Sequence, residues 1–230
     1  MIRTVLRDSC FNLTDNMLDK FEKYAALLVE WNQKMNLTTI TEPRQIAVKH
    51  FWDSLLTLQA FDIPKGARVI DVGTGAGFPG VPIKVRRPDI DLTLLDSLQK
   101  RLTFLEALTK AVGVSAELVH SRAEDAAKLA AFRETFDIAV SRAVAPLNVL
   151  LEYCLPFVKV GGVFIALKGN KAQLEIGNAE NALKFLSGEI FKVEKFNLKG
   201  EERNIVVVKK VSALDSSYPR CSAKIKRNPL

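Results

Sequence analysis

Residues 69–80 read VIDVGTGAGFPG, and this stretch decides the fold. It completes an apolar, β-branched run over 67–73 that predicts a strand buried inside a parallel sheet. Three glycines follow at alternate positions: Gly73, Gly75 and Gly77. Glycine permits positive φ and lets a ligand approach the backbone closely. A short helix expected over 80–86 completes the strand–turn–helix unit that opens nucleotide-binding α/β domains.

The glycine spacing separates this turn from a dinucleotide-binding loop. Dinucleotide sites favour G-x-G-x-x-G, whose third glycine lies beneath a pyrophosphate. The pattern here is G-x-G-x-G, with the acid Asp71 two residues before it. Such a loop suits a ligand with a nucleoside and no phosphate, and we expect Asp71 to face its ammonium group. A glycine-rich turn in some other α/β protein is the alternative interpretation.

The next predicted strand, over 91–96, ends in a second acid, Asp96. An acid at the tip of the second strand, about twenty residues past the glycines, is where ribose hydroxyls are held. The glycine turn and Asp96 together resemble motifs I and II of class I S-adenosylmethionine-dependent methyltransferases.

Strands and helices alternate from Gly66 onward and predict one α/β domain with a seven-stranded, mostly parallel, Rossmann-like sheet. The expected strands are Ala67–Gly73, Asp91–Asp96, Glu117–His120, Phe136–Ser141, Val163–Lys168, Phe191–Leu198 and Ile205–Lys210. Only a short turn separates the last two strands, so they must pair as an antiparallel hairpin. An antiparallel edge hairpin is typical of class I methyltransferases and disfavours a dehydrogenase.

Three parts are predicted along the chain. Residues 1–62 form an N-terminal helical cap packed on the main domain, and its first helix starts at Thr14 or Asp15. Residues 63–211 form the cofactor-binding methyltransferase domain, and residues 212–230 form a basic tail. The aromatic side chains of the cap are expected to be packing residues: Trp31, Phe51 and Trp52.

Composition excludes several classes of protein. No apolar run approaches the ~18–20 residues that span a bilayer. The three cysteines have no C-x-x-C spacing, which argues against a disulfide framework or a zinc site and favours the cytoplasm. The net charge is +7, and residues 199–230 carry eight basic and three acidic side chains. This surplus predicts a polyanion partner; a solvated tail without a partner is the alternative.

The motifs together resemble the RsmG (GidB) family, which methylates N7 of a guanine in bacterial small-subunit ribosomal RNA. Matching pieces occur in the family's order over nearly the whole chain: Trp31-Asn32, Asn36–Thr38, His50, Asp53–Leu55, Asp71–Gly80, Leu94–Leu98, Lys100-Arg101, Arg122–Glu124, Ser141–Ala143, Lys168-Gly169 and Tyr218–Arg220. The resemblance implies S-adenosylmethionine as methyl donor and 16S ribosomal RNA, or the small subunit or its assembly intermediate, as partner. We also expect a monomer without metal.

The carboxyl ends of the predicted strands gather the expected cofactor contacts. These are Asp71, Gly73, Gly75, Gly77, Phe78, Asp96, Ser97, Leu98, Ala123, Glu124 and Arg142. In the resembling family, the equivalents of Gly73, Phe78, Ala123, Glu124 and Arg142 contact the cofactor. Glu124 can instead serve the dipole of a helix N-terminus, and Arg142 can instead form a surface ion pair.

Methylation of guanine N7 predicts no catalytic base, because N7 already carries a free lone pair. Arg142 and Lys168 are the expected positioning residues for the base. The candidate RNA contacts are His50, Lys100, Arg101, Arg203, Arg220, Lys224, Lys226 and Arg227. We expect the basic residues beyond Lys210 not to be needed by the fold; a tail folded over the pocket is the competing possibility. A methyltransferase acting on a small molecule or another RNA, an NAD-dependent oxidoreductase and a non-enzymatic RNA-binding module are the alternative functions.

Overall fold

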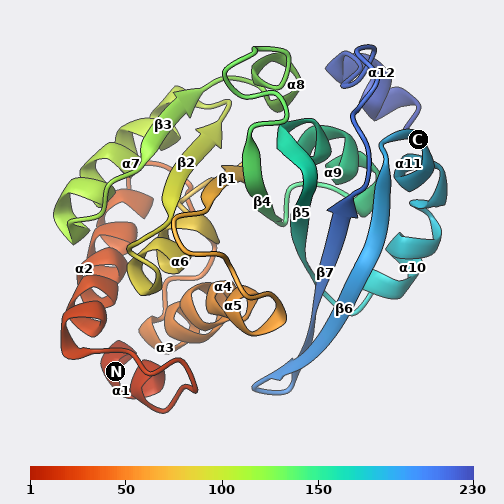
Figure 1. Cartoon of the computed structure of the whole chain (residues 1–230). Coiled ribbons are helices and arrows are strands. Elements are labelled where there is room, and N and C mark those ends of the chain that lie inside the picture. The colour runs from red at the N-terminus through yellow and green to blue at the C-terminus, as the bar shows by residue number, and fades with distance from the viewer.

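The computed structural model describes residues 1–230, which fold around one seven-stranded sheet (Figure 1). The strands are β1 (Arg68–Val72), β2 (Asp91–Asp96), β3 (Glu117–His120), β4 (Phe136–Arg142), β5 (Val158–Lys168), β6 (Gly188–Leu198) and β7 (Glu201–Lys210). Their order in the sheet is β3-β2-β1-β4-β5-β7-β6. Strands β1 to β5 pair in parallel, while β7 runs antiparallel to both β5 and β6. The predicted sheet and its antiparallel edge hairpin are confirmed.

The last three strands are longer than the sequence predicts. Strand β5 starts at Val158 instead of Val163, and its added residues 159–161 are exposed. Strand β6 starts at Gly188 instead of Phe191, and β7 starts at Glu201 instead of Ile205. These extensions carry polar residues and glycines, so they lack the apolar run that marks a buried strand.

Helices cover both faces of the sheet. One face carries α1 (Ile2–Arg7), α2 (Asp15–Asn32), α3 (Pro43–Ile46), the π-helix η1 (Ala47–Trp52), α4 (Asp53–Leu55), α5 (Thr57–Ala60), α6 (Gly80–Arg86) and α7 (Gln99–Val112). The other carries α8 (Ala123–Ala126), α9 (Leu147–Cys154), the 3₁₀ helix η2 (Leu155–Phe157), α10 (Ala172–Gly177), α11 (Glu180–Phe185) and α12 (Ser222–Arg227). No helix has the length and apolar character needed to cross a bilayer.

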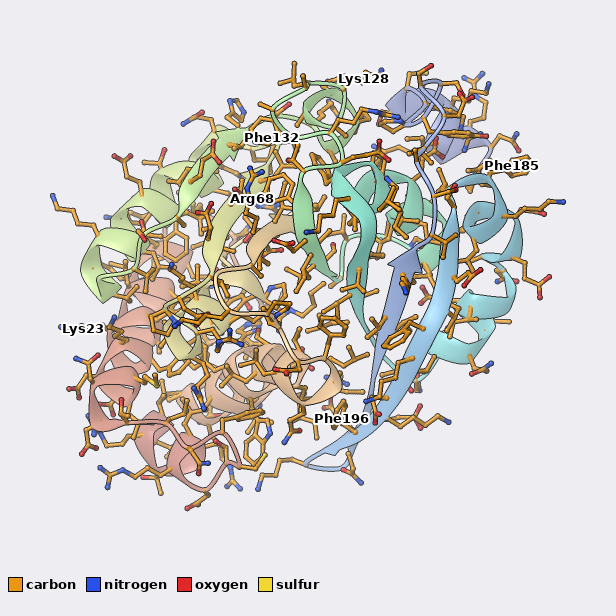
Figure 2. All side chains as sticks on the ribbon, in the orientation of Figure 1. Lys23, Arg68, Lys128, Phe132, Phe185 and Phe196 are labelled. Carbon is orange, nitrogen blue, oxygen red and sulfur yellow. The ribbon has the colours of Figure 1, made fainter.

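The N-terminal helices share a hydrophobic core with the sheet. Helix α2 begins where predicted, with the Thr14 side chain accepting a hydrogen bond from the Met17 amide. Its apolar stripe packs in a cluster of 37 buried residues that includes β1, β2 and α7. Figure 2 shows Phe196 of β6 where the edge hairpin passes the N-terminal helices, and it packs on the same cluster. Phe51 is fully buried in this cluster, and Trp31 and Trp52 are partly buried against the cluster, so all three are packing residues as predicted.

The C-terminal segment is not a free arm. It forms α12, beside the C-terminus at the upper edge of the molecule in Figure 1, and buries Ile225 in the second core cluster. Upstream of it, Arg220 makes an ion pair with Glu152 of α9 at 2.6 Å, and the two side chains are 10% and 1% exposed. The expectation that the fold does not need the basic residues beyond Lys210 is therefore wrong for Arg220. A charge count along the sequence cannot detect this anchor, because its acidic partner lies 68 residues away.

Candidate active site

The carboxyl ends of the parallel strands surround one cavity of about 720 Å³. Its walls come from the segments that directly follow β1, β2, β3 and β4, which is where an open α/β sheet binds ligands. The N-terminal cap adds Leu37, Thr38 and His50, and the C-terminal segment adds Ser222, Lys226 and Pro229. The site therefore draws on all three parts of the chain.

The glycine turn after β1 forms the floor of this cavity. The Gly73 and Thr74 amides donate to the Leu95 carbonyl at 2.9 and 3.1 Å, which ties the turn to β2. Gly75 has φ of +61°, and a Cβ there would project into open space. Glycine at this position keeps the floor open for a ligand.

Asp71 lies beneath the turn and does not line the cavity. Its Oδ2 accepts hydrogen bonds from the Thr74 hydroxyl at 2.7 Å and the Gly80 amide at 2.8 Å. The side chain is fully buried, and this burial raises the pKa of Asp71 to about 7. The structure thus corrects the expectation that Asp71 faces a ligand ammonium group, because the carboxyl holds the turn onto the start of α6.

Gly77 also lies outside the cavity. Its φ is +96°, and a Cβ would come within 2.6 Å of the Tyr24 hydroxyl oxygen. That hydroxyl donates to the Ala76 carbonyl at 2.5 Å. Gly77 therefore allows α2 to pack against the turn, which is a structural role instead of the expected ligand contact.

Asp96 lies at the tip of β2 and lines the cavity beside Ser97. Its carboxylate accepts hydrogen bonds from the Gly75 amide at 2.9 Å and the Leu98 amide at 3.0 Å, and Arg101 lies 3.1 Å away. The Leu98 side chain is 42% exposed and does not line the cavity. Leu98 therefore orients Asp96 through its backbone amide, and Arg101 forms an ion pair with the same carboxylate.

Ala123 and Glu124 line the cavity where α8 begins after β3. The Glu124 side chain is buried, and its Oε1 has no hydrogen-bond partner in the chain. A buried carboxylate oxygen without a donor is costly, so this end of the cavity is suited to a ligand that brings an N–H donor. Tyr153 of α9 and Ser222 of α12 line the same cavity.

Arg142, at the end of β4, lines the cavity and is only 13% exposed. Its Nη1 donates to the Asp53 carboxylate at 3.0 Å and to the Lys49 carbonyl at 3.1 Å. The guanidinium carbon also lies 4.7 Å from the centre of the Phe78 ring. Arg142 is therefore held by the buried Asp53 and Phe78 side chains and by the Lys49 carbonyl, which replaces the alternative of a surface ion pair.

His50 stacks on Phe78, with the ring centres 4.5 Å apart. Burial, and then the charge of Arg142, lower the pKa of His50 to about 3, so the ring is neutral at physiological pH. Both rings line the cavity. The sequence places His50 among the RNA contacts, whereas the structure places it in the wall of the ligand cavity.

Comparisons with known proteins agree with this geometry. A model of the family described as "GidB: rRNA small subunit methyltransferase G" matches residues 17–206. The chain belongs to this family. It is 50% identical over 216 residues to ribosomal RNA small subunit methyltransferase G of Thermoanaerobacter sp. (strain X514), covering 93% of this chain and 90% of the relative. The corresponding protein of Brevibacillus brevis is 46% identical over 229 residues, covering 98% and 96%.

Solved structures of other methyltransferases share the fold. A methyltransferase from Pyrococcus furiosus matches with a TM-score of 0.57 at 15% identity, covering 83% of this chain and 98% of that one. The M. jannaschii protein TYW2, in complex with AdoMet, matches with a TM-score of 0.54 at 13% identity, covering 69% and 77%. The predicted class I methyltransferase fold and the family resemblance are confirmed.

The family's methyl donor, S-adenosylmethionine, fits the residues in the cavity. The unpaired Oε1 of Glu124 suits the exocyclic amine of adenine, and the Ala123 backbone lies beside it in sequence. Asp96 suits the ribose hydroxyls, since carboxylates make charge-assisted hydrogen bonds to them. The open glycine floor between these residues and Arg142 leaves room for the methionine part. No group of three His, Cys, Asp or Glu is placed to hold a metal ion.

Three basic residues that the sequence suggests as contacts of the RNA or the target base form ion pairs with acidic side chains of the chain itself. The Lys168 ammonium donates to the Ala145 carbonyl at 2.7 Å and lies 2.7 Å from Glu175. It does not line the cavity, so it supports the loop after β4 instead of touching a base. Arg203 pairs with Asp53 at 3.1 Å and Glu201 at 2.7 Å. Arg220, as described above, anchors the C-terminal segment.

The remaining basic candidates divide into residues that line the cavity and residues on the exposed surface. Lys226 and Arg101 line the cavity, whereas Lys100, Lys224 and Arg227 are exposed and make no ion pair within the chain. Sequence reasoning did not place several wall residues in the site: Leu37, Thr38, Val144, Pro146, Tyr153, Ser222 and Pro229. The only signal for the first two was the shared Asn36–Thr38 piece, and its spacing alone does not show that it reaches the strand ends.

Proposed function

We propose that this protein transfers the methyl group of S-adenosylmethionine to N7 of a guanine in small-subunit ribosomal RNA. The observation that carries the proposal is a methyltransferase cavity in which Glu124 has a buried, unpaired oxygen for the cofactor and no side chain at the Arg142 end is free to accept a proton. Family membership supplies the substrate class, since the relatives are named for small-subunit ribosomal RNA.

The bound cofactor supplies a methyl group attached to a positively charged sulfur. Guanine N7 attacks with a lone pair that the neutral base already has, so no proton must leave first. The groups around Arg142 agree with this requirement. His50 Nδ1 lies 3.2 Å from Arg142 Nη2, and the Asp53 oxygens are bound to Arg142 and Arg203. None of these groups is available as a general base, so the chain's contribution is to position the base.

RNA binding is supported by cations in the cavity wall and by their exposed neighbours in the sequence. Arg101, Arg122 and Lys226 line the cavity. Lys100 is the exposed neighbour of Arg101, and the exposed Lys224 and Arg227 flank Lys226 in α12. Contacts of such side chains with phosphates make affinity depend on salt, because each contact releases counterions. A target base must also be turned out of its loop to enter a cavity of this kind.

The experiment is to incubate the purified protein with S-adenosylmethionine and small-subunit RNA, and to map methylated nucleosides by mass spectrometry. We expect one 7-methylguanosine to be absent from the small-subunit RNA of cells that lack the gene. Incubation of this RNA with the protein should restore it. The single-turnover rate should be flat between about pH 6 and 9, because no deprotonation is required and burial lowers the pKa of His50 to about 3. Methylation of another atom, or a rate rising steeply with pH, would contradict the proposal.

A further inference from the structure

The loop after α2 brings a hydroxyl group to the cavity wall in a fixed position. The Asn32 side chain at the end of α2 accepts hydrogen bonds from the Leu37 amide at 2.8 Å and the Thr38 amide at 2.9 Å. Leu37 and Thr38 both line the cavity that also contains His50 and Arg142. Thr38 is therefore held in place by its backbone before any ligand enters.

Arg142 determines which nitrogen of His50 carries the proton. A guanidinium can only donate, so His50 Nδ1, 3.2 Å from Arg142 Nη2, must accept. The proton of the neutral ring then lies on Nε2. This nitrogen is 2.8 Å from Thr38 Oγ1 and donates to it.

The Thr38 hydroxyl consequently keeps only its proton free for a hydrogen bond. Its oxygen accepts from His50 Nε2 and also from the Ile40 amide at 3.0 Å, which uses both lone pairs. The hydroxyl proton makes no hydrogen bond to any other group of the chain. A hydroxyl in this state on a cavity wall is a hydrogen-bond donor for a ligand.

We propose that Thr38 selects the target base by donating its hydroxyl proton to O6 of guanine, an inference that rests on the proposed function. O6 is an acceptor directly beside N7, whereas adenine presents an amine donor at the same place. With adenine, the Thr38 hydroxyl and the adenine amine would be two donors facing each other, which disfavours binding. The contact therefore selects guanine by attraction and rejects adenine by repulsion.

The other acceptor available to this hydroxyl is the methionine carboxylate of the cofactor. Arg142 is the better partner for a carboxylate, because it is a cation and its Nε makes no hydrogen bond within the chain. A neutral hydroxyl oriented by a neutral imidazole suits a neutral carbonyl. Asp53 forms ion pairs with Arg142 and Arg203. It thereby fixes the position of Arg142, which in turn orients His50 and Thr38.

The test compares Thr38→Val, which removes the hydroxyl at nearly constant shape, with Thr38→Ser, which keeps it. Methyl transfer is measured on small-subunit RNA whose mapped target guanine is retained, replaced by 2-aminopurine, which lacks O6, or replaced by inosine, which keeps it. On guanine, we expect Thr38→Val to be about 10–100-fold slower than wild type and Thr38→Ser to be within threefold. Affinity for S-adenosylhomocysteine should change less than twofold in both variants.

The analogues isolate the contact from a merely structural role of Thr38. Wild type should be at least tenfold slower on 2-aminopurine than on inosine, and this ratio should fall towards one in Thr38→Val. An unchanged ratio would overturn the inference, as would a large loss of S-adenosylhomocysteine affinity, which would assign the hydroxyl to the cofactor. Absence of 7-methylguanosine with wild type would instead overturn the proposed function, and the inference with it.

Discussion

The two ends of the cavity are built in different ways. At the Glu124 end, Asp96 is the last residue of β2, and Glu124 lies in the short helix α8 that begins just after β3. Neither side chain forms an ion pair with a residue far away in the sequence. At the Arg142 end, one network joins Thr38 and His50 of the cap, Asp53 of α4, Arg142 of β4 and Arg203 of β7.

This difference predicts how many other residues a substitution should affect at each end of the cavity. A change at the Glu124 end removes the contacts of one side chain with the ligand. A change at the Arg142 end leaves buried charges or donors unpaired in segments far apart in the chain. We therefore expect losses of both stability and activity at the Arg142 end, and of binding alone at the Glu124 end.

Asp53→Ala should give the largest effect. It leaves Arg142 and Arg203 without their shared carboxylate, and Asp53 is only 7% exposed. Breaking a buried ion pair by removing one partner costs about 4 kcal/mol, and we expect methyl transfer to fall with it because His50 and Thr38 lose their orientation. Urea denaturation and single-turnover kinetics measure the two losses.

The matched control is Asp62→Ala, since Asp62 is an exposed acid that follows the same helical segment and makes no ion pair. It should change stability by less than about 0.5 kcal/mol. If Asp53→Ala were as stable and active as this control, the Arg142 end would be no more cooperative than the Glu124 end.

Arg220→Ala should give the second largest effect and tests the wall that α12 adds. Without Arg220, the Glu152 carboxylate stays buried at 1% exposure with no cation beside it. We expect a stability loss of about 3 kcal/mol and weaker S-adenosylhomocysteine binding, because Ser222 and Lys226 of α12 line the cavity. Denaturation and calorimetry on the same variant measure both.

Arg227→Ala is the control for Arg220→Ala, because Arg227 lies exposed at the end of α12, the helix that follows Arg220. It should leave stability and cofactor affinity unchanged and reduce the salt slope of RNA binding by up to about one unit. The reverse pattern, in which Arg220→Ala alters only RNA binding, would restore the free basic arm expected from the sequence.

Asp71→Asn tests the floor that the two ends share. The pKa of Asp71 is raised to about 7 in the folded chain, against 3.8 for an ordinary Asp. A carboxyl group whose pKa is higher in the folded than in the unfolded chain stabilises the folded state. This stabilisation is complete below the pKa of the unfolded chain, and it is lost as the pH rises through the pKa of the folded chain. From pH 4 to pH 6 the Asp71 contribution should therefore fall by about 2 kcal/mol, and Asp71→Asn should abolish that fall.

Denaturation of both proteins across this pH range is the measurement. Parallel stability profiles for wild type and Asp71→Asn would show that the Asp71 carboxyl titrates normally and is not confined beneath the turn. Cofactor affinity should change little, because Asp71 does not line the cavity.

The sequence predicted the sheet well because its signals are local. The strands β2 and β3 have the predicted bounds, and the glycine turn and Asp96 lie at strand ends as a parallel sheet requires. The roles of Asp71 and Gly77 could not be predicted, because a position beside the turn does not show whether a side chain faces the ligand or the core. Asp71 faces the start of α6, and Gly77 faces Tyr24.

Charge gave the weakest guidance, because pairing partners lie far away in sequence. Arg203 and Arg220 count as surplus basic residues in the C-terminal region, yet they pair with Asp53 and Glu152. The segment that contains Arg220 consequently becomes part of the cavity wall. Long-range ion pairs of this kind are visible only once the fold has brought the segments together.

Glu124→Gln should give the smallest effect and the sharpest contrast with Asp53→Ala. The unpaired Oε1 of Glu124 is a cost to the free protein that a donor on the adenine ring relieves. Replacing the charge by an amide should weaken S-adenosylhomocysteine binding by about tenfold, since a charge-assisted hydrogen bond becomes a neutral one. The free protein should be at least as stable as wild type, because the desolvated charge is gone. Asp125→Asn is the control, because Asp125 is an exposed acid in the same first turn of α8 and feels the same helix dipole. Equal binding losses in the two variants, or a stability loss in Glu124→Gln alone, would assign Glu124 to the helix and not to the ligand.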